Sequence, residues 1–256
     1  MMKVDLTHHR LEMYSSIDEM PVERFHKYNK MLLIDSGIGS DLSAFDQHVA
    51  KVGAYLKGGK MDQAQKELDN LRQNIYMIQG ELSPSMMSFA ALVKNIDGRE
   101  ITDISDDSLK EIADQLKDEK VKDITEIADD VKKKIDHELR TYFPSYFDNA
   151  PEKDFYDQLL IRTKLMLKQI TEGHDEGRQS KIDEITDKLL TFTNPMSFAG
   201  SENAEVLHDK QFVDMCLVIS QNLHVEAERM SVMKFYKALE LLREQAKERK
   251  KAMKKK

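Results

Sequence analysis

Hydrophobic residues between positions 21 and 80 recur at three- and four-residue steps, the spacing that lines one side of an α-helix. Glycine-containing breaks at 35–41 and 57–60 divide this stretch into three segments. Helices joined by short connections fold back on one another, so three antiparallel helices are expected. The residues expected to face inward are Val22, Phe25, Tyr28 and Leu32, then Leu42, Phe45, Val49, Val52 and Leu56, then Ala64, Leu68, Leu71, Ile75 and Ile78.

The first break contains residues suited to ending one helix and starting the next. Gly37 and Gly39 can adopt the positive φ that follows a helix ending near Asp35. Ser40 or Asp41 can accept from the first free N–H groups of the following helix. The loop lacks the lysine of a phosphate-binding loop and the central glycine of a calcium loop, so a tight turn between helices is the interpretation.

The same helical period continues to the end of the chain. Residues 1–20 are expected as an extended arm or a short helix, 99–103 alternate too little to predict a strand, and 191–201 are expected as an irregular connection. The residues expected to face inward in this part include Ala90, Ala91 and Val93, Ile124, Val131, Ile135 and Leu139, Phe155, Leu159, Leu160 and Ile170, Ile182 and Ile185, Val206, Val213, Leu217 and Val218, and Phe235.

These patterns together predict an all-α fold, a multi-helix bundle of about nine to ten helices. Two packed helical subdomains are expected, an N-terminal bundle over 1–98 and a C-terminal bundle with a basic tail over 99–256. A composition of 33% charged residues with only 5 Pro and 10 Gly fits this class, because a sheet sandwich needs many more turn residues.

A single cysteine, Cys216, excludes an internal disulfide framework and a cysteine-based zinc site, and it fits a reducing compartment. The N-terminus lacks the apolar region of a signal peptide, and no apolar run approaches the roughly 20 residues of a membrane span. We therefore expect a cytoplasmic protein that has no membrane partner.

The net charge of −7 is unevenly distributed. The tail from Arg243 to Lys256 carries a net charge of +6, which leaves −13 on the remainder. An acidic body is poorly suited to wrapping nucleic acid, so nucleic acid is not expected as a partner of the body. The tail is interpreted as the fraying end of a helix, and a contact between the tail and RNA is kept as an alternative.

The pattern Glu-x-x-His occurs twice, at Glu23/His26 and at Glu205/His208. On a helix this spacing places both side chains on one face, and two such pairs with further carboxylates hold di-iron centres in ferritin-like bundles. Because a chain so rich in glutamate produces such pairs by chance, the four residues are retained only as candidate metal ligands. No metal, cofactor or catalytic set is assigned, and the protein is expected not to be an enzyme.

Methionines and clustered aromatic residues are the candidates for contacting another protein. Flexible thioethers suit adaptable contact surfaces, and aromatic residues crowded around Pro144 suit either a plug between helices or a docking site. Filling of the core is the alternative use of both kinds of residue. The candidate partner-binding residues are Met86, Met87, Tyr142, Phe143, Tyr146, Phe147, Phe235 and Tyr236.

Four stretches of the chain, at 23–30, 33–41, 138–144 and 230–239, resemble an uncharacterised protein group from the tail-gene modules of phages and prophages of gut Bacteroides-type bacteria. The C-terminal end, a Ser-capped helix with Phe235-Tyr236 near its start and a basic finish, is similar to the ends of phage tail assembly chaperones.

This resemblance implies a non-enzymatic virion-assembly or tail-module protein in the bacterial host cytoplasm or in the virion. Its expected partner is a phage structural or tape-measure protein, and self-association stays open. The alternatives are a metal-binding helical bundle that uses the Glu-x-x-His pairs and a regulator that contacts nucleic acid through the lysine-rich tail.

Overall fold

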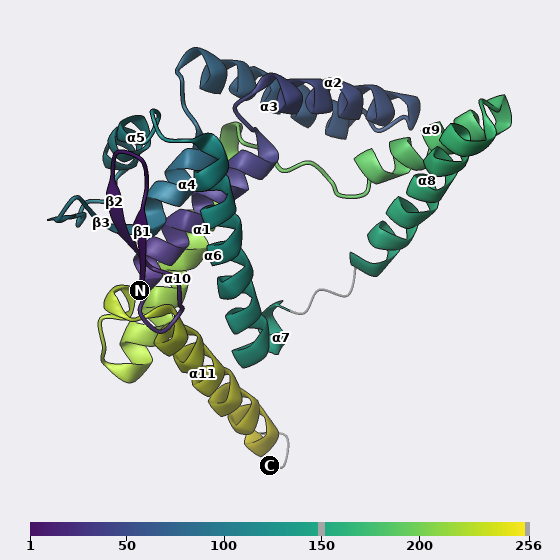
Figure 1. The fold of residues 1–256 in the computed structure, drawn as a ribbon. Helices are drawn as coiled ribbons and strands as arrows, with labels where there is room; N and C mark the ends of the chain where they lie inside the picture. The colour runs from purple at the N-terminus through teal and green to yellow at the C-terminus, as the bar shows by residue number, and fades with distance from the viewer. Residues whose placement is uncertain (148–151, 254–256) are drawn as a thin grey trace. The chain divides into compact units, whose positions relative to one another are not determined.

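The computed structural model describes residues 1–147 and 152–253, and within these residues it contains eleven α-helices, ten of them seven residues or longer. Helix makes up 72% of the described residues, which confirms the expected all-α class (Figure 1). The chain divides into two compact units. Unit 1 comprises 1–36, 82–147 and 205–256, and unit 2 comprises 37–81 and 148–204.

This division differs from the expected halves at 1–98 and 99–256, because each unit is assembled from stretches that are distant in sequence. The elements of unit 1 are β1 (Met2–Asp5), β2 (Arg10–Met13), α1 (Val22–Gly37, with Gly37 itself in unit 2), α4 (Pro84–Leu92), β3 (Val93–Ile96), β4 (Arg99–Glu100), α5 (Asp106–Gln115), α6 (Val121–Tyr142), α7 (Pro144–Phe147), α10 (Ala204–Leu223, with Ala204 in unit 2), a 3-10 turn at Ala227–Arg229 and α11 (Val232–Met253).

The four strands of the described residues form an antiparallel sheet in the order β1-β2-β3-β4. Leu11 lies opposite Val4 and Ile96, and Leu11, Val93 and Ile96 are all buried. The sheet corrects two expectations, since residues 1–20 contain a hairpin and Val93 starts a strand rather than continuing a helix. Strands of two to four residues show too few alternations for their period to be recognised.

Arg24 fastens α1 to the junction of α4 and β3. Its side chain is buried, and its guanidinium donates hydrogen bonds to the carbonyl oxygens of Ala91, Val93 and Ile101. Buried carbonyl groups at the point where a helix ends need donors, and a five-donor guanidinium can serve several at once. Arg24 therefore holds the sheet and α1 in one folded unit.

The helical patterns expected in the middle of unit 1 are confirmed. Ser83 and Ser105 cap α4 and α5 by accepting from the N–H groups of Met86 and Ser108. Along α6 the expected inward residues are buried, and the helix ends at Tyr142 just before Pro144. The buried residues on α6 are Ile124, Val131, Ile135 and Leu139.

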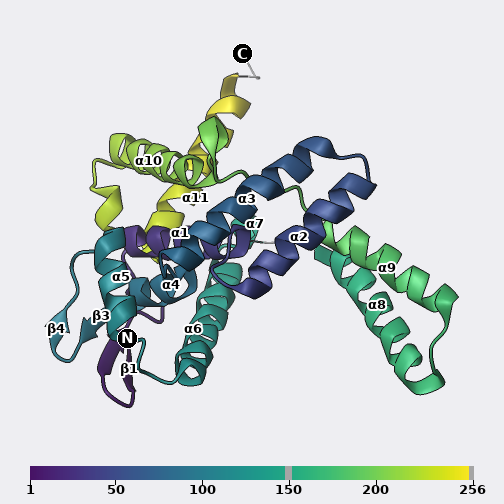
Figure 2. The ribbon, with the colours of Figure 1, turned by 90° about the horizontal axis from the view of Figure 1, so that it is seen from above.

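Unit 2 contains the helical hairpins α2–α3 and α8–α9, which Figures 1 and 2 show as pairs of neighbouring antiparallel helices. Their bounds are α2 (Leu42–Lys57), α3 (Met61–Gln79), α8 (Glu152–Glu172) and α9 (Glu176–Leu190), followed by an irregular segment with a 3-10 turn at Gly200–Glu202. Ile182 and Ile185 of α9 are buried as expected, and 191–199 is irregular as expected.

The turn between α1 and α2 is partly as expected. Asp41 caps α2 by accepting from Ala44 N at 2.7 Å, and Gly39 has a φ of +66°. Gly37, however, is the last residue of α1 and does not have positive φ. A Cβ at this position would overlap the ring of Phe198, so Gly37 permits a close approach between α1 and the irregular segment.

The apolar stripes of α2 and α3 face the core only in part, since Ala64 is buried as expected but other residues of the stripes are exposed. Three residues on each helix are between 37% and 72% exposed, and they are Leu42, Val49 and Leu56 on α2 and Met61, Leu68 and Ile75 on α3. The helices bury their polar side instead, with His48, Tyr55, Glu67, Asn70 and Asn74 all at 3% exposure or less. Expected inward residues on α8 and α10 are also exposed, namely Leu160, Ile170, Val206, Val213, Leu217 and Val218.

The backbone of the irregular segments explains why a polar side is buried. Tyr55 Oη donates to Thr193 O at 2.7 Å, and Asn70 Nδ2 donates to Met196 O at 2.9 Å. Asn74 Nδ2 donates to Ile38 O at 3.0 Å. Carbonyl groups outside helices and strands need donors when they are buried. The polar side of the α2–α3 hairpin supplies them.

A buried pair, His48 and Glu67, joins the two helices of this hairpin. His48 Nδ1 donates to Glu67 Oε2 at 2.6 Å, and His48 Nε2 donates to Ile38 O at 2.9 Å. Because each ring nitrogen faces an acceptor, both bonds form when the ring carries both protons. The pair is then a buried, hydrogen-bonded ion pair that depends on both partners.

Replacing Glu67 by Ala is expected to destabilise unit 2 by about 3–5 kcal/mol, because His48 is left buried without its carboxylate. The measurement is urea denaturation followed by circular dichroism. Asp69→Ala on the same helix removes a partly exposed pair with Arg72 and is the control, with an expected change within about 0.5 kcal/mol. Equal losses in the two variants would contradict a special role for the buried pair.

Candidate functional site

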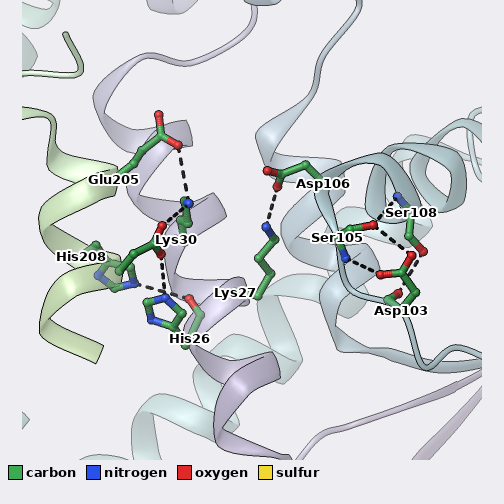
Figure 3. A network of polar contacts seen from close by, with 10 residues as sticks. His26, Lys27, Lys30, Asp103, Ser105, Asp106, Ser108, Glu205 and His208 are labelled. Carbon is green, nitrogen blue, oxygen red and sulfur yellow. Dashed lines mark hydrogen bonds and ion pairs between the residues drawn. The ribbon is translucent and has the colours of Figure 1, made fainter. Parts of the chain in front are cut away.

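A polar network connects α1 to α10 within unit 1 (Figure 3). Asp209 on α10 accepts from His26 Nε2 at 2.9 Å and from Lys30 Nζ at 2.7 Å. His26 and Lys30 are four residues apart on α1, so they lie on the same side of that helix and converge on one carboxylate. Asp209 was not singled out from the sequence, where it is one of many surface acids.

His26 is also held by stacking. Its ring lies between His208, with centroids 4.4 Å apart, and Phe212, with centroids 4.1 Å apart, and both planes are nearly parallel to it. His208 Nε2 donates to the His26 carbonyl at 3.4 Å. The two rings on α10 are four residues apart and form a slot that takes one imidazole.

Of the four candidate metal ligands, only His26 and His208 are in direct contact, and a lysine lies beside Glu205. Glu205 lies 3.9 Å from Lys30 Nζ, while Glu23 faces the adjoining pocket. The Lys30 ammonium contacts both Glu205 and Asp209, and Figure 3 shows it beside Glu205. Within the described residues no group of three or more His, Cys, Asp or Glu side chains could hold a metal ion. The Lys30 ammonium therefore supplies the positive charge that these carboxylates face.

Burial and pairing set the protonation of this network. Desolvation lowers the pKa of His26 below its ordinary 6.5 and outweighs the hydrogen bond to Asp209. Desolvation also raises the pKa of Glu205. Desolvation alone would raise the pKa of Asp209, but the bonds from Lys30 and His26 together keep it below its ordinary value. His26 is thus stabilised as the neutral ring that donates through Nε2.

An open pocket of about 410 Å³ adjoins the network and reaches the start of α5. On its far side Lys27 Nζ lies 2.6 Å from Asp106, and Asp103 accepts from the N–H and hydroxyl of Ser105. Both lysines in the pocket are paired with carboxylates of the chain itself. The arrangement acts as an electrostatic clamp between α1, α5 and α10.

A larger open cavity, of about 700 Å³, lies over the outer face of the sheet. Its charges are also paired internally, through Arg10–Asp5 at 2.7 Å, Lys3–Glu12 at 3.3 Å and His9–Asp97 at 2.7 Å. The first two are exposed cross-strand pairs of opposite charge, which contribute modestly to the sheet, and the third joins the residue before β2 to the residue after β3.

The candidate partner-binding aromatic residues meet at one side chain, Tyr236 of α11. Its ring centroid lies 5.5 Å from that of Phe143, 5.7 Å from Tyr146 and 5.2 Å from Phe147. Phe25 of α1 adds an edge contact at 6.4 Å. Desolvation raises the pKa of Tyr236 to about 12. This cluster packs α7 and the end of α6 against α11.

The exposure of the candidate residues separates them into two groups. Phe143, Phe235 and Met87 are buried, and Met86, Tyr146, Phe147 and Tyr236 are half-buried. Tyr142 alone among the eight is exposed, at 57%. Seven of the eight therefore contribute to packing within unit 1. The aromatic cluster joins α6 and α7 to α11.

The exposed apolar side chains of unit 2 include several that were expected to be core. On α2 and α3 the exposed residues repeat every seven positions, at Leu42, Val49 and Leu56 and at Met61, Leu68 and Ile75. With the residues between them they follow the 3-4-3-4 spacing of a coiled-coil seam. That spacing was visible in the sequence and signals a helix-binding surface as well as a core.

These two rows lie on the same side of the hairpin. On both helices the buried residues stand one position before the exposed rows in the seven-residue repeat, at His48 and Tyr55 on α2 and at Glu67 and Asn74 on α3. Because α2 and α3 are antiparallel and bury the same repeat position, the two rows either face each other or lie on opposite outer edges of the hairpin. Asn70, on the other flank of α3, contacts the irregular segment, so we infer that the rows face each other across a common strip. We call this strip the α2–α3 groove.

Among the described helices, none has the length and hydropathy needed to cross a membrane. Comparisons of the chain with protein-family models, with curated proteins and with solved structures find no match.

Stability around His26 is expected to fall as the pH drops below about 6.5. The folded-state pKa of His26 lies below its unfolded value, so its contribution is complete above the unfolded pKa and is lost as pH falls toward the folded pKa. The measurement compares urea midpoints at pH 7.5 and 5.5 for the natural chain and for His26→Gln. A smaller pH effect in the variant is the expected result, and an identical effect would contradict it.

Truncating Tyr236 to Ala is expected to destabilise unit 1 by about 2–3 kcal/mol, because a half-buried aromatic ring at the centre of a cluster is removed. The matched control is Tyr142→Ala, whose exposed ring should cost no more than about 0.5 kcal/mol. Thermal unfolding followed by circular dichroism measures both. A stable Tyr236→Ala variant would mean that the ring is not a packing centre.

Proposed function

We propose that this chain is a non-enzymatic interaction protein that holds an amphipathic helix of another protein in the α2–α3 groove. The observation that carries this proposal is the pair of exposed apolar rows on α2 and α3. Exposed apolar surface of this extent, arranged in rows, is typical of interaction sites. Helix-in-groove recognition uses apolar anchors at the same three- and four-residue spacing.

The dimensions of the groove suit a short helix. Each row spans fourteen residue steps, from 42 to 56 and from 61 to 75, which corresponds to ~21 Å along a helix. The fitting ligand is therefore an amphipathic helix of about four turns with apolar residues on one side. It would lie between the two rows and complete a three-helix arrangement.

Buried polar residues beneath the α2–α3 groove keep its apolar rows exposed. Tyr55, Asn70 and Asn74 are fixed by hydrogen bonds to backbone carbonyl groups, and His48 is fixed by Glu67. Turning the apolar rows inward would break these bonds and leave buried polar groups without partners. A preformed surface of this kind loses little free energy to rearrangement on binding.

The resemblance to phage and prophage tail-module proteins leads us to propose a phage structural or tape-measure protein as the partner. Apolar helices of such a partner, exposed before assembly, are the ligands that the groove would hold. The negative net charge of the chain would help to keep such a complex soluble. The function is then that of an assembly component similar to a tail assembly chaperone.

The test places a photoreactive amino acid at position 68, inside the groove, in host cells that produce the phage proteins. The expected product is a crosslink to an amphipathic helical segment of one phage structural protein. The same amino acid at position 47, which is exposed on the opposite side of α2, is the control and should not give this product.

Leu68→Asp extends the test, because it places a charge in the groove without touching the buried polar side. Affinity for the crosslinked segment should fall at least about tenfold, as expected when an apolar anchor is lost, while Gln47→Asp leaves it unchanged. The proposed function is overturned if position 68 gives no crosslink to a phage structural protein. It is also overturned if Leu68→Asp leaves the affinity for the segment unchanged.

A further inference from the structure

We infer that two copies of this chain pair by reciprocal docking, with α8 of each copy lying in the α2–α3 groove of the other. This inference rests on the α2–α3 groove of the proposed function. It states that α8 of a second copy occupies the groove when no other partner is bound. The argument comes from the pattern of α8, from the match of its length and register to α3, and from charge.

One side of α8 is an apolar seam that nothing in unit 2 covers. Tyr156, Leu160, Thr163, Leu167 and Ile170 follow a 4-3-4-3 spacing, which is the a/d spacing of a coiled coil. All five are exposed, the four large apolar residues at 53–79%. The opposite side of α8 already packs on α9, where Arg162 Nε donates to Thr186 Oγ1 at 2.8 Å. The seam is thus a second surface that requires a helical partner.

The seam has the same length as each row of the groove. It runs from 156 to 170, and the rows run from 42 to 56 and from 61 to 75, so each covers two heptads. In an antiparallel coiled coil an a position of one helix meets a d position of the other. A single register satisfies this at four positions along α3, pairing Tyr156 with Ile75, Leu160 with Leu71, Thr163 with Leu68 and Ile170 with Met61, while Leu167 lies over Ala64, which is buried within the hairpin.

Charge supports the same register. In it, Asp157 of α8 lies beside Arg72 of α3, on the edge of the seam where antiparallel helices place opposing charges. Arg72 is exposed and lies 3.3 Å from Asp69, so a second carboxylate can approach its guanidinium from the open side. Lys164, the next charged position on that edge of α8, lies beside the uncharged Gln65. No like charges meet on this edge.

A second copy, rather than a different protein, accounts for both open surfaces at once. Each copy carries one groove and one seam, so a twofold pair uses all four surfaces and leaves none open. Two helix-in-groove contacts then form together, and each raises the effective concentration of the other. The partner helix of the proposed function would compete with α8 for the groove.

The test uses two single-cysteine additions, Leu68→Cys in one copy and Thr163→Cys in another, which the register places opposite each other. Cys216 is buried, so the natural chain serves as the blank. After mixing of the two purified variants and mild oxidation, the expected result is a disulfide-linked pair in the mixture that exceeds the amount from either variant alone. Lys168→Cys, exposed but away from the seam, replaces Thr163→Cys as the matched control.

Light scattering supplies the second measurement. The purified chain should have twice its mass of 29.6 kDa, and Leu160→Asp with Leu167→Asp on the exposed seam should convert it to a monomer with unchanged helix content. A monomeric natural chain, or equal crosslinking at positions 163 and 168, overturns the inference. These measurements use the purified chain without a partner protein, so a failed dimer test does not contradict the proposal that the groove binds a helix of another protein. A missing crosslink in host cells would contradict that proposal and would leave the dimer unaffected.

Discussion

Hydrogen bonds from buried side chains to the carbonyl groups of irregular segments determine how unit 2 is built. The irregular segment after α9 packs on the α2–α3 hairpin, and its carbonyl groups accept from Tyr55 and Asn70. The turn before α2 is served in the same way by His48 and Asn74. A hairpin that turns its polar side inward must leave its apolar side open. The proposed helix-binding groove follows from that single constraint.

The sequence was sufficient for features that depend on neighbouring residues. Helix positions followed from the apolar period, and the cap of α2 followed from residue type and position, since Asp41 was one of the two residues expected there. The buried side of α6 was also predicted, because the opposite face is dense in charged residues and only the apolar face can be buried. The strands were missed because four residues or fewer cannot display a period, and pairing between residues 11 and 96 is not encoded locally.

The orientation of α2 and α3 could not be obtained by the same reasoning. An amphipathic helix has two sides, and the usual rule assigns the apolar one to the core. Here buried Glu67 and Asn74 are stabilised by partners that are distant in sequence or lie on another helix, which only the fold brings together. The Glu-x-x-His pairs illustrate the same limit, since both were recognised but the intervening Lys30 became apparent only in three dimensions.

The interleaved composition of the units has a consequence for the growing polypeptide as it leaves the ribosome. Unit 2 is complete once residue 204 has been made, whereas unit 1 still waits for α10 and α11, which supply Asp209 and Tyr236 to residues translated much earlier. Domains fold as they emerge, so the α2–α3 hairpin can mature while α1 lacks its final neighbours. A nascent chain would thus expose the α2–α3 groove before unit 1 is complete. This order favours binding of a partner, or of a second copy of this chain, during translation on the same polysome.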